Sequence, residues 1–536
     1  MLRRLDLSRL RNLGFLLVPA VVLPLAGLGA EALSSELPGG GLMAVAHATK
    51  GPAKLEPTPF KVKPFQVELP IPPVLHPDRV QGNTEFFEVP IEETKVHIPG
   101  LPDGLKTTIW GFDGQFPGPT IEAMRGRPQE VHFVNRLPKE VGKECCTIHR
   151  HGGDQAPKDD GHPADIHPPG DTQDNNYPND QRAATLWYHD HTMDITGRNV
   201  NMGIAGAFIL RDDREEQLKE RRRLPPDDRD IPLTITDRLF EANGDFNYPI
   251  VDGLPVLDGF KGDVMLVNGA VQPFFEVATR KYMFRLFNIS NAREYDLRLS
   301  TGQPFIVVAS EGGFLDKPIP TKDIHLVPAQ RVVVVVDFSD LPVGSHVVLE
   351  NVGGDSFALS LDKPLPAPSE IMRFDVVHKE SDDVRLADEL NPDFHRFKEE
   401  EAKRTREFVF ERDGGRWAIN KELFEPDRID ATVQRGDVEI WKLVNPAGGW
   451  SHPIHVHSVD FQILDRNGKP PEPWESGFVD MFQLNPNDVV RFIGRFNGVP
   501  GAGPGHPIIE RTFPFHCHNT EHEDHAMMGL FELLPH

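Results

Sequence analysis

The stretch His516-Cys517-His518, near the carboxyl end, constrains the fold of this chain more than any other. If these residues form a β-strand, both imidazoles project from one face, roughly 6.6 Å apart, and the thiol of Cys517 projects from the other. The imidazole face could then bind neighbouring metal ions, while the thiol binds a different one.

Paired histidines recur in the sequence far more often than chance predicts. Random placement of 23 histidines among 536 residues gives about one His-x-His pair, whereas four occur. Eight imidazoles from two domains would suit a compact cluster of metal ions, and imidazole favours copper, zinc, iron or nickel over magnesium or calcium. For any single pair, a solvated or packed strand is the alternative. The pairs are His149 with His151, His189 with His191, His455 with His457, and His516 with His518.

The residues around Cys517 indicate copper. His522 follows it by five residues and Met527 by ten, and His452 precedes the third histidine pair. Two histidines, one thiolate and a weak axial methionine form the ligand set of a blue-copper electron-transfer site. A structural zinc site would need more thiolates, or a closed set of four ligands without methionine. The peptide around Cys517 would therefore link this copper to the histidine cluster by a short covalent path.

The composition is that of a soluble, all-β protein with several domains. The chain of 536 residues exceeds what one hydrophobic core organises, and 50 Pro and 46 Gly indicate many turns. A net charge of −24 at pH 7 repels nucleic acid and anionic membranes, and favours solubility or cationic partners. With only three cysteines, the chain has no disulfide framework.

The amino-terminal residues have the pattern of an export signal. Arginines within residues 1–11 precede an apolar run, Gly14–Ala30, which two prolines make too short and broken for a stable membrane span. We therefore expect a signal peptide and leader over residues 1–48, and a secreted, periplasmic or cell-surface protein. The residues after Arg3-Arg4 fit twin-arginine export poorly, so the general secretory route is favoured.

Two highly charged stretches, Arg211–Asp230 and His378–Arg406, interrupt the β-like pattern and are expected to be partly helical linkers. They divide the mature chain into segments of about 160, 150 and 130 residues, each near the usual domain size. The expected domains are 55–212, 228–380 and 405–536.

A weak internal repeat supports this division. Each segment holds a strand-like stretch that ends in asparagine, and a turn-like residue lies 19–25 positions upstream. Three copies of one β-sandwich explain the repeat, although any all-β protein can show such similarity by chance. The asparagines are Asn135, Asn288 and Asn445, and the turn residues are Gly114, Gly269 and Asn420.

At these residues the chain resembles the multicopper oxidases, and within them the bilirubin oxidases and bacterial spore-coat laccases. The resemblance implies three cupredoxin-like Greek-key β-sandwich domains, with a copper cluster between the first and the third. The middle domain, which lacks paired histidines, would be structural and would help to wall the substrate surface. The motifs that carry the resemblance are Leu186-Trp-Tyr-His-Asp-His191, Asn199–Leu210, Arg280-Lys-Tyr-Met-Phe-Arg285 and Gly448-Gly-Trp-Ser-His-Pro-Ile-His-Val-His457.

The resemblance also implies four copper ions. A type 1, blue copper is expected at His452, Cys517 and His522, with Met527 as the axial ligand. A type 2 copper is expected at His149 and His455. A pair of type 3 coppers would take the other six paired histidines, His151, His189, His191, His457, His516 and His518.

Asp160 and Glu523 match positions that this family uses to handle protons during O2 reduction. Each O2 consumes four protons as well as four electrons, and imidazoles committed to copper cannot carry them. The alternative is that both are solvated surface carboxylates.

Other features have no place in the family pattern. Cys145 and Cys146 would be buried small residues or an unusual local disulfide. The stretch Asp154–Arg182, rich in Pro, Asp and Asn, is expected to form a surface loop. A surface or supporting role is expected for three histidines near the ligands that lack paired spacing, His162, His167 and His525.

The implied activity is that of a laccase-like oxidase, which takes single electrons from phenols, aromatic amines or tetrapyrroles and reduces its co-substrate O2 to water. The substrate would bind in a surface depression beside His452 or His522, where Trp450 either lines the depression or packs against the core. Cys517 would carry electrons to the cluster. We expect a monomer with no nucleic-acid partner.

Three alternatives remain at this stage. A metallo-oxidase would act on Mn(II), Fe(II) or Cu(I), but the Met-rich runs of cuprous oxidases are absent here. A copper-storage or electron-carrier protein would not need eight paired histidines. Nitrite reductases usually have two such domains and fewer paired histidines.

Overall fold

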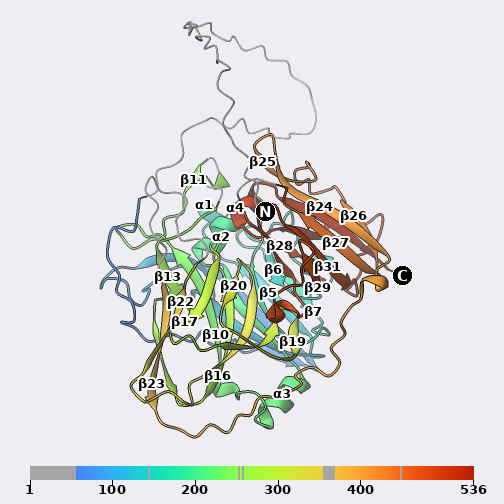
Figure 1. The fold of residues 1–536 in the computed structure, drawn as a ribbon. Helices are drawn as coiled ribbons and strands as arrows, with labels where there is room; N and C mark the ends of the chain where they lie inside the picture. The colour runs from blue at the N-terminus through green and yellow to red at the C-terminus, as the bar shows by residue number, and fades with distance from the viewer. Residues whose placement is uncertain are drawn as a thin grey trace, which may run out of the picture. The chain divides into compact units, whose positions relative to one another are not determined.

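Three β-sandwiches follow one another along the chain (Figure 1). The computed structural model describes residues 56–142, 145–251, 254–255, 259–353, 369–446 and 450–535, so the leader expected over residues 1–48 lies outside the described residues. Within these ranges, no helix has the length and apolar character that crossing a membrane requires. The expected all-β class is confirmed.

The first sandwich packs two sheets around one core, which includes Phe133 and Phe208. One sheet contains β1 (Arg79–Gln81), β2 (Thr84–Val96), β5 (Gln129–Asn135) and β7 (Thr172–Tyr177), in that order, with β3 (Thr107–Phe112) paired to β2. The other has the order β4 (Gly118–Met124), β9 (Ala205–Arg211), β8 (Ala184–Asp190) and β6 (Ile148–His151). The loops hold α1 (Lys139–Gly142), η1 (Pro157–Asp159) and α2 (Thr196–Met202).

The second sandwich has the largest sheet, in which alternating valines of one strand fill the core. Its strand order is β14 (Ala270–Val271), β13 (Val264–Val267), β10 (Asp230–Arg238), β16 (Lys281–Asn288), β21 (Arg331–Asp337), β18 (Phe305–Ser310) and β19 (Gly313–Thr321). The facing sheet has the order β15 (Phe274–Ala278), β23 (Glu370–His378), β22 (His346–Asn351), β17 (Tyr295–Leu299) and β20 (Ile324–Leu326), and β11 (Ile250–Val251) pairs separately with β12 (Leu254–Pro255).

The third sandwich encloses an aromatic core that includes Trp441, Phe461 and Phe515. One sheet has the order β25 (Arg416–Ile419), β24 (Arg404–Asp413), β27 (Val438–Val444), β31 (Val489–Arg495) and β29 (Phe461–Arg466). The other has the order β26 (Ala431–Gln434), β33 (Met528–Leu534), β32 (Thr512–Cys517), β28 (His452–Val456) and β30 (Met481–Leu484). Short helices η4 (Pro473–Glu475), η5 (Ile508–Glu510) and α4 (Thr520–Asp524) lie in its loops.

The weak sequence repeat has a structural counterpart. Strands β5, β16 and β27 each run parallel to the first long strand of their own sandwich, β2, β10 and β24 respectively. The asparagine at the end of each donates its side-chain N–H to a carbonyl of the following loop, at 2.6 to 2.9 Å. All three upstream turn residues have positive φ, which suits glycine and asparagine. The three sandwiches therefore share the same parallel strand pair and the same asparagine hydrogen bond to the loop that follows it.

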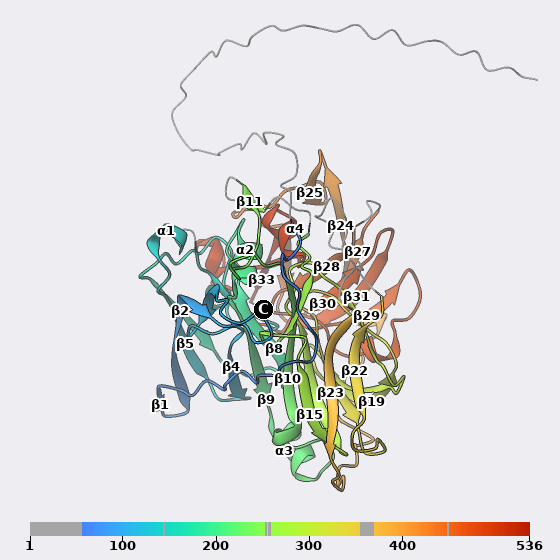
Figure 2. The ribbon, with the colours of Figure 1, turned by 90° about the vertical axis from the view of Figure 1, so that its left-hand side faces the viewer.

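The first charged stretch is not a solvated linker. It contains α3 (Asp213–Glu220) and η2 (Asp227–Arg229), and it lies at the lower end of the second sandwich (Figure 2). Arg285 of β16 pairs with Glu215 at 2.6 Å and with Asp230 at 2.8 Å, and all three side chains are buried. Arg211, at the end of β9 in the first sandwich, pairs with the same Asp230 at 2.9 Å. Because buried charges are tolerated only when paired, this network fixes the first sandwich to the second.

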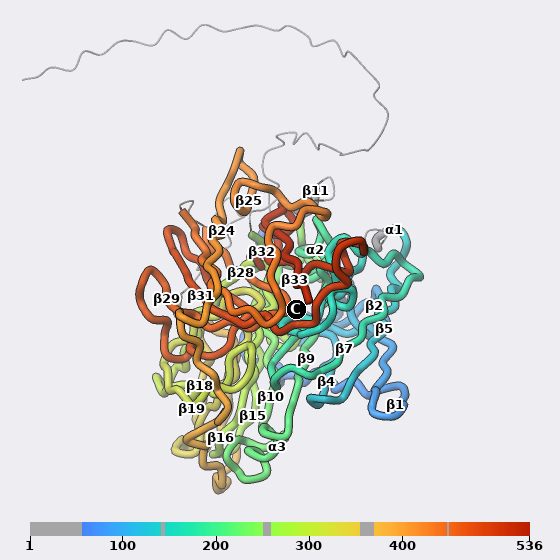
Figure 3. The backbone as a smooth tube through the Cα atoms, turned by 90° about the vertical axis from the view of Figure 1, so that its right-hand side faces the viewer, coloured from blue at the N-terminus to red at the C-terminus, as the bar shows by residue number. Residues whose placement is uncertain are grey.

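Between the end of β23 and the start of β24, the second charged stretch contains one described element, η3 (Glu399–Glu401). The domain ranges 55–212, 228–380 and 405–536 stay predictions. In Figures 1 and 3, the orange and red strands of the third sandwich lie beside the blue-green strands of the first, so the first and last sandwiches of the described chain are neighbours in space.

Helix α4 holds the three sandwiches together at this junction. The Asp524 carboxylate accepts hydrogen bonds from the backbone N–H groups of Thr196 and Gly197, which begin α2, at 2.8 and 2.9 Å. Glu521 accepts the hydroxyl of Tyr248 at 2.7 Å and the N–H of Phe260 at 2.9 Å, both from the second sandwich. The helix therefore cannot shift without breaking buried hydrogen bonds to both neighbours.

Asp524→Ala should leave two buried N–H groups without an acceptor, at a cost of about 1–3 kcal/mol each. We expect the urea midpoint of unfolding, followed by tryptophan fluorescence, to fall clearly. Glu425→Ala, which removes an exposed carboxylate, is the control and should not shift it. An unchanged midpoint for Asp524→Ala would show that α4 is not a structural junction.

Candidate metal centres

The structure brings all eight paired histidines together at the contact between the first and third sandwiches. In the first, β6 pairs with β8 so that His149 lies opposite His189, and in the third, β28 pairs with β32 so that His455 lies opposite His516. The rings stack across the contact, with centroids 3.9 Å apart for His149 and His457. The eight side chains are fully buried.

Three of these rings surround a point suited to a metal ion. The Nε2 atoms of His191, His457 and His516 lie 3.1 to 3.2 Å from one another. A point equidistant from them is about 1.8 Å from each, close to an ordinary metal–imidazole bond. No arrangement of protons gives all three nitrogens good hydrogen bonds, whereas one cation satisfies all three lone pairs.

The other five rings also fit metal ions. They carry buried nitrogens without a hydrogen-bond partner, which native structures rarely tolerate. In three of the rings, Nδ1 donates to a backbone carbonyl at 2.6 to 3.0 Å, which leaves the lone pair on Nε2. Burial lowers the pKa of six rings well below its usual value, so they stay neutral and able to ligate: His151, His189, His191, His455, His457 and His518.

A second centre forms around Cys517. Its Sγ lies 3.4 Å from Nδ1 of His452 and 3.5 Å from Nδ1 of His522, and the two Nδ1 atoms are 3.1 Å apart. Met527 is buried in the same core, and its carbonyl accepts the N–H of Cys517. Burial raises the pKa of the Cys517 thiol well above its usual value, so a thiolate here requires a bound cation.

Asp160 and Glu523 both contact the histidine cluster from within the protein. Asp160 Oδ2 lies 2.7 Å from Nδ1 of His457. Glu523 reaches Nδ1 of His516 at 3.1 Å and Nδ1 of His191 at 3.4 Å. Both carboxyl groups are buried, so neither is a solvated surface group.

The two carboxyl groups have opposite pKa shifts. Burial raises the pKa of Asp160, although His149 and Gln155 oppose the shift. Burial would also raise the pKa of Glu523, but His516 and His191 outweigh it and hold the pKa below its usual value.

Comparison with known proteins agrees with this geometry. Three family models described as Multicopper oxidase match residues 94–215, 234–360 and 396–535. A bilirubin oxidase of Albifimbria verrucaria is 34% identical, over 91% of this chain and 84% of that protein. A laccase of Bacillus subtilis is 32% identical, over 88% and 98%. The solved laccase of Pediococcus acidilactici is 30% identical, with a TM-score of 0.76 over 90% of this chain and 95% of that one.

The chain belongs to the multicopper oxidase family. It is therefore a copper-dependent oxidoreductase that uses a small-molecule substrate and O2 as electron acceptor. The expected fold of three cupredoxin-like sandwiches is confirmed by the same matches.

In this multicopper oxidase the middle sandwich also contacts the cluster, which the sequence did not reveal. Arg331 of β21 makes a buried, two-pronged pair with Asp480, at 2.7 and 2.6 Å. Asp480 in turn lies 3.3 Å from Nε2 of His151, and its carbonyl accepts Nδ1 of His455 at 3.0 Å. An arginine that begins a strand of five valines was the available signal, because a charge there needs a buried partner.

Other expectations are corrected or completed. The stretch Asp154–Arg182 is only partly a surface loop: it contains η1 and β7, and several of its polar side chains are buried, such as Asn175, whose side-chain N–H donates to the carbonyl of Asp159 at 2.9 Å. Cys145 and Cys146 form a local disulfide buried beside Asp190. Of the unpaired histidines, His162 is buried, whereas His167 and His525 are partly exposed.

The imidazoles beside Cys517 are not open to solvent. His452 is 2% exposed and His522 is 0% exposed, so a substrate meets their neighbours rather than the rings. Trp450 is partly exposed, packs against the core of the third sandwich, and lies 5.3 Å from His522 between ring centroids. It therefore packs against the core, as one of the two interpretations expected, and its lining of a substrate depression stays a prediction.

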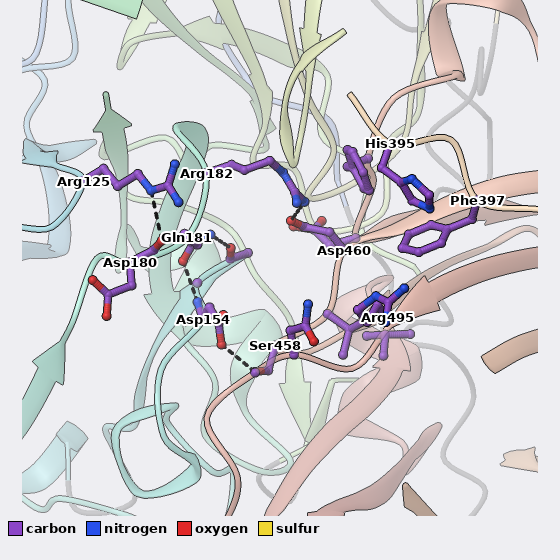
Figure 4. Close-up of a pocket in the computed structure, with 18 residues that line it drawn as sticks. Arg125, Asp154, Asp180, Gln181, Arg182, His395, Phe397, Ser458, Asp460 and Arg495 are labelled. Carbon is purple, nitrogen blue, oxygen red and sulfur yellow. Dashed lines mark hydrogen bonds and ion pairs between the residues drawn. The ribbon is translucent and has the colours of Figure 1, made fainter. Parts of the chain in front are cut away.

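A cavity of about 440 Å³ lies beside the histidine cluster (Figure 4). Its lining includes Gly152, which follows His151 in the chain, and Asp480. Figure 4 shows Asp154 turned toward Ser458, and Arg182 paired with Asp460. Burial and the nearby Asp460 raise the pKa of Asp154 to about 6. Polar side chains therefore line a cavity whose walls include residues next to the cluster histidines in the chain.

Arg331→Met should leave Asp480 as an uncompensated buried charge, which destabilises by about 3–5 kcal/mol. We expect a lower thermal midpoint and fewer copper ions per chain, measured by calorimetry and metal analysis. The matched control is Arg298→Gln in the same sandwich, which breaks an exposed ion pair with Asp323 and should change neither quantity. Full copper content with wild-type stability would contradict a positioning role for Arg331.

Proposed function

We propose that this multicopper oxidase is laccase-like: it oxidises phenols, aromatic amines or tetrapyrroles by single electrons and reduces O2 to water with four bound copper ions. The observation that carries the proposal is the position of β32. This strand supplies Cys517 to one centre, and His516 and the adjacent His518 to the other. The two centres are therefore joined through the backbone of three consecutive residues.

The ligand sets follow the expected assignment. A type 1 copper would be held by His452, Cys517 and His522, with Met527 axial, and a type 2 copper by His149 and His455. The distances between Nε2 atoms support one type 3 copper at His191, His457 and His516. The rings of His151, His189 and His518, with centroids 5.1 to 5.7 Å apart, would hold the other.

Copper in these sites would supply one-electron acceptance at the first centre and delivery of four electrons to O2 at the second. The protein's own part is to fix the imidazoles by hydrogen bonds to carbonyl and carboxylate oxygens, so that each presents a lone pair. It also excludes bulk water from the cluster by burying all eight rings between two sandwiches. Asp160 and Glu523 would exchange protons with the cluster, since each already contacts imidazoles there.

Cys517→Ser tests the proposal directly. We expect the protein to lose its intense visible absorption and all oxidase activity, while metal analysis still finds the copper of the histidine cluster. The control is His346→Gln, at an exposed histidine of the second sandwich, which should retain absorption and activity. If the blue absorption or the activity survives in Cys517→Ser, the proposal is wrong.

Glu523→Gln keeps the shape of the side chain but removes its proton chemistry. Loss of a general acid or base typically costs 10²–10⁴-fold, so we expect O2 consumption to slow by about a hundredfold. Anaerobic bleaching of the blue absorption by a phenol should keep its wild-type rate, because that step precedes O2. Asp160→Asn should give the same separation of the two rates. Equal slowing of both rates would instead indicate a structural role.

A second candidate is oxidation of Mn(II), Fe(II) or Cu(I). The net charge of −24 favours it, since an acidic surface attracts cations. Comparing turnover of a phenolic dye with that of each ion, with and without added copper, separates the candidates. From the sequence of residues 1–48, we further propose that the protein is exported, which N-terminal analysis would test. We also propose that it is a monomer, which light scattering would test.

A further inference from the structure

A tryptophan covers the buried histidine ligands of the Cys517 centre. The ring of Trp417, on β25, lies 4.0 Å from His522 and 5.2 Å from His452 between centroids. It is only 3% exposed, and its Nε1–H is buried without a hydrogen-bond partner, which a purely structural position would avoid. An electron that reaches His522 from this side must pass this indole.

An arginine lies on the outer side of the same indole. Arg412 on β24 is the cross-strand partner of Trp417, so both side chains share one face of the hairpin. The Arg412 guanidinium carbon is 3.9 Å from the centroid of the Trp417 ring. The Trp417 ring in turn contacts His522, so the three side chains lie in the order Arg412, Trp417, His522. The Arg412 side chain is exposed, and the β24–β25 hairpin projects at the top of the ribbon in Figures 1, 2 and 3.

The guanidinium is suited to bind an anion at this point. Arginine presents a planar fork of donors that matches a carboxylate, and a cation above an indole is held there by about 0.5–1 kcal/mol at exposed sites. The net charge of −24 disfavours the approach of anions in general, and the positive charge of Arg412 opposes this locally. Partly exposed Trp450, 6.2 Å from Trp417 between centroids, offers an aromatic surface beside it.

We propose that Arg412 is a specificity-determining residue, which docks aromatic reductants that carry a carboxylate so that their electrons enter through Trp417. This proposal rests on the proposed oxidation of phenols, and it identifies phenols that carry a carboxylate as the preferred substrates. In each step a phenol loses one electron and its hydroxyl proton, the proton goes to water, and a phenoxyl radical leaves. With copper bound at Cys517, Trp417 and His522 would give the electron a path to it. Four such steps supply one O2.

The test compares two phenols that differ only in a carboxylate, 2,6-dimethoxyphenol and its para-carboxylate, syringate. In the copper-loaded protein, Arg412→Gln should lower kcat/KM for syringate about fourfold more than for the neutral phenol, as expected for an exposed ion pair. Arg412→Lys, which keeps the positive charge, should retain most of the wild-type preference for syringate over the neutral phenol. Arg416 is the cross-strand neighbour of Asp413 and therefore lies on the opposite face of the hairpin from Arg412. Arg416→Gln should leave the ratio of kcat/KM for syringate to kcat/KM for the neutral phenol unchanged.

A binding measurement separates docking from turnover. The probe is 3,5-dimethoxybenzoate, which lacks the phenolic hydroxyl, titrated by calorimetry into the copper-loaded protein at low and high salt. We expect binding that weakens about fourfold in Arg412→Gln, weakens with salt, and is weaker by a similar factor for neutral 1,3-dimethoxybenzene, whose affinity Arg412→Gln should not change. Equal affinity and equal selectivity in wild type and Arg412→Gln would overturn the inference while leaving the oxidase function intact. If neither phenol bleaches the blue absorption, the proposed function itself fails.

Discussion

The alternation of side chains along one short strand is the constraint on which the rest of this molecule depends. Because β32 ends at Cys517, the thiol enters the core of the third sandwich while His516 faces the contact with the first. The same geometry applies to β6, β8 and β28, whose paired imidazoles all face that contact. Because neighbouring side chains of a strand point to opposite faces, consecutive residues of one strand serve two different candidate metal centres.

Burying eight imidazoles between the first and third sandwiches costs free energy when no metal is bound. Copper binding is therefore coupled to the stability of the contact between these two sandwiches. An unsatisfied buried polar atom costs about 1–3 kcal/mol, and several imidazole nitrogens here have no partner. The surroundings limit the cost by orienting the other nitrogens toward carbonyl and carboxylate oxygens, including those of Asp160 and Asp480. The free energy of metal binding is therefore partly free energy of assembly of the two sandwiches.

Much of the fold and of the site followed from local sequence patterns, because both depend on strand period. The histidine pairs, Cys517 and the repeated asparagines are local signals, and the structure brings them together as the period implies. What escaped prediction depends on contacts between distant segments. The Arg331 and Asp480 pair joins two sandwiches, and the burial of Asp154–Arg182 depends on partners that polar composition does not indicate. The cover of Trp417 over His522 likewise needs the hairpin in place.

We infer that residues 516–518 bind one copper through the thiol of Cys517 and two more through the imidazoles of His516 and His518, within a cluster of three. Diffraction from a crystal of the copper-loaded protein at the copper absorption edge tests it most directly. We expect one anomalous peak among His452, Cys517 and His522, and three peaks enclosed by the eight paired histidines. Peaks at the first position alone, or none between the two sandwiches, would contradict it.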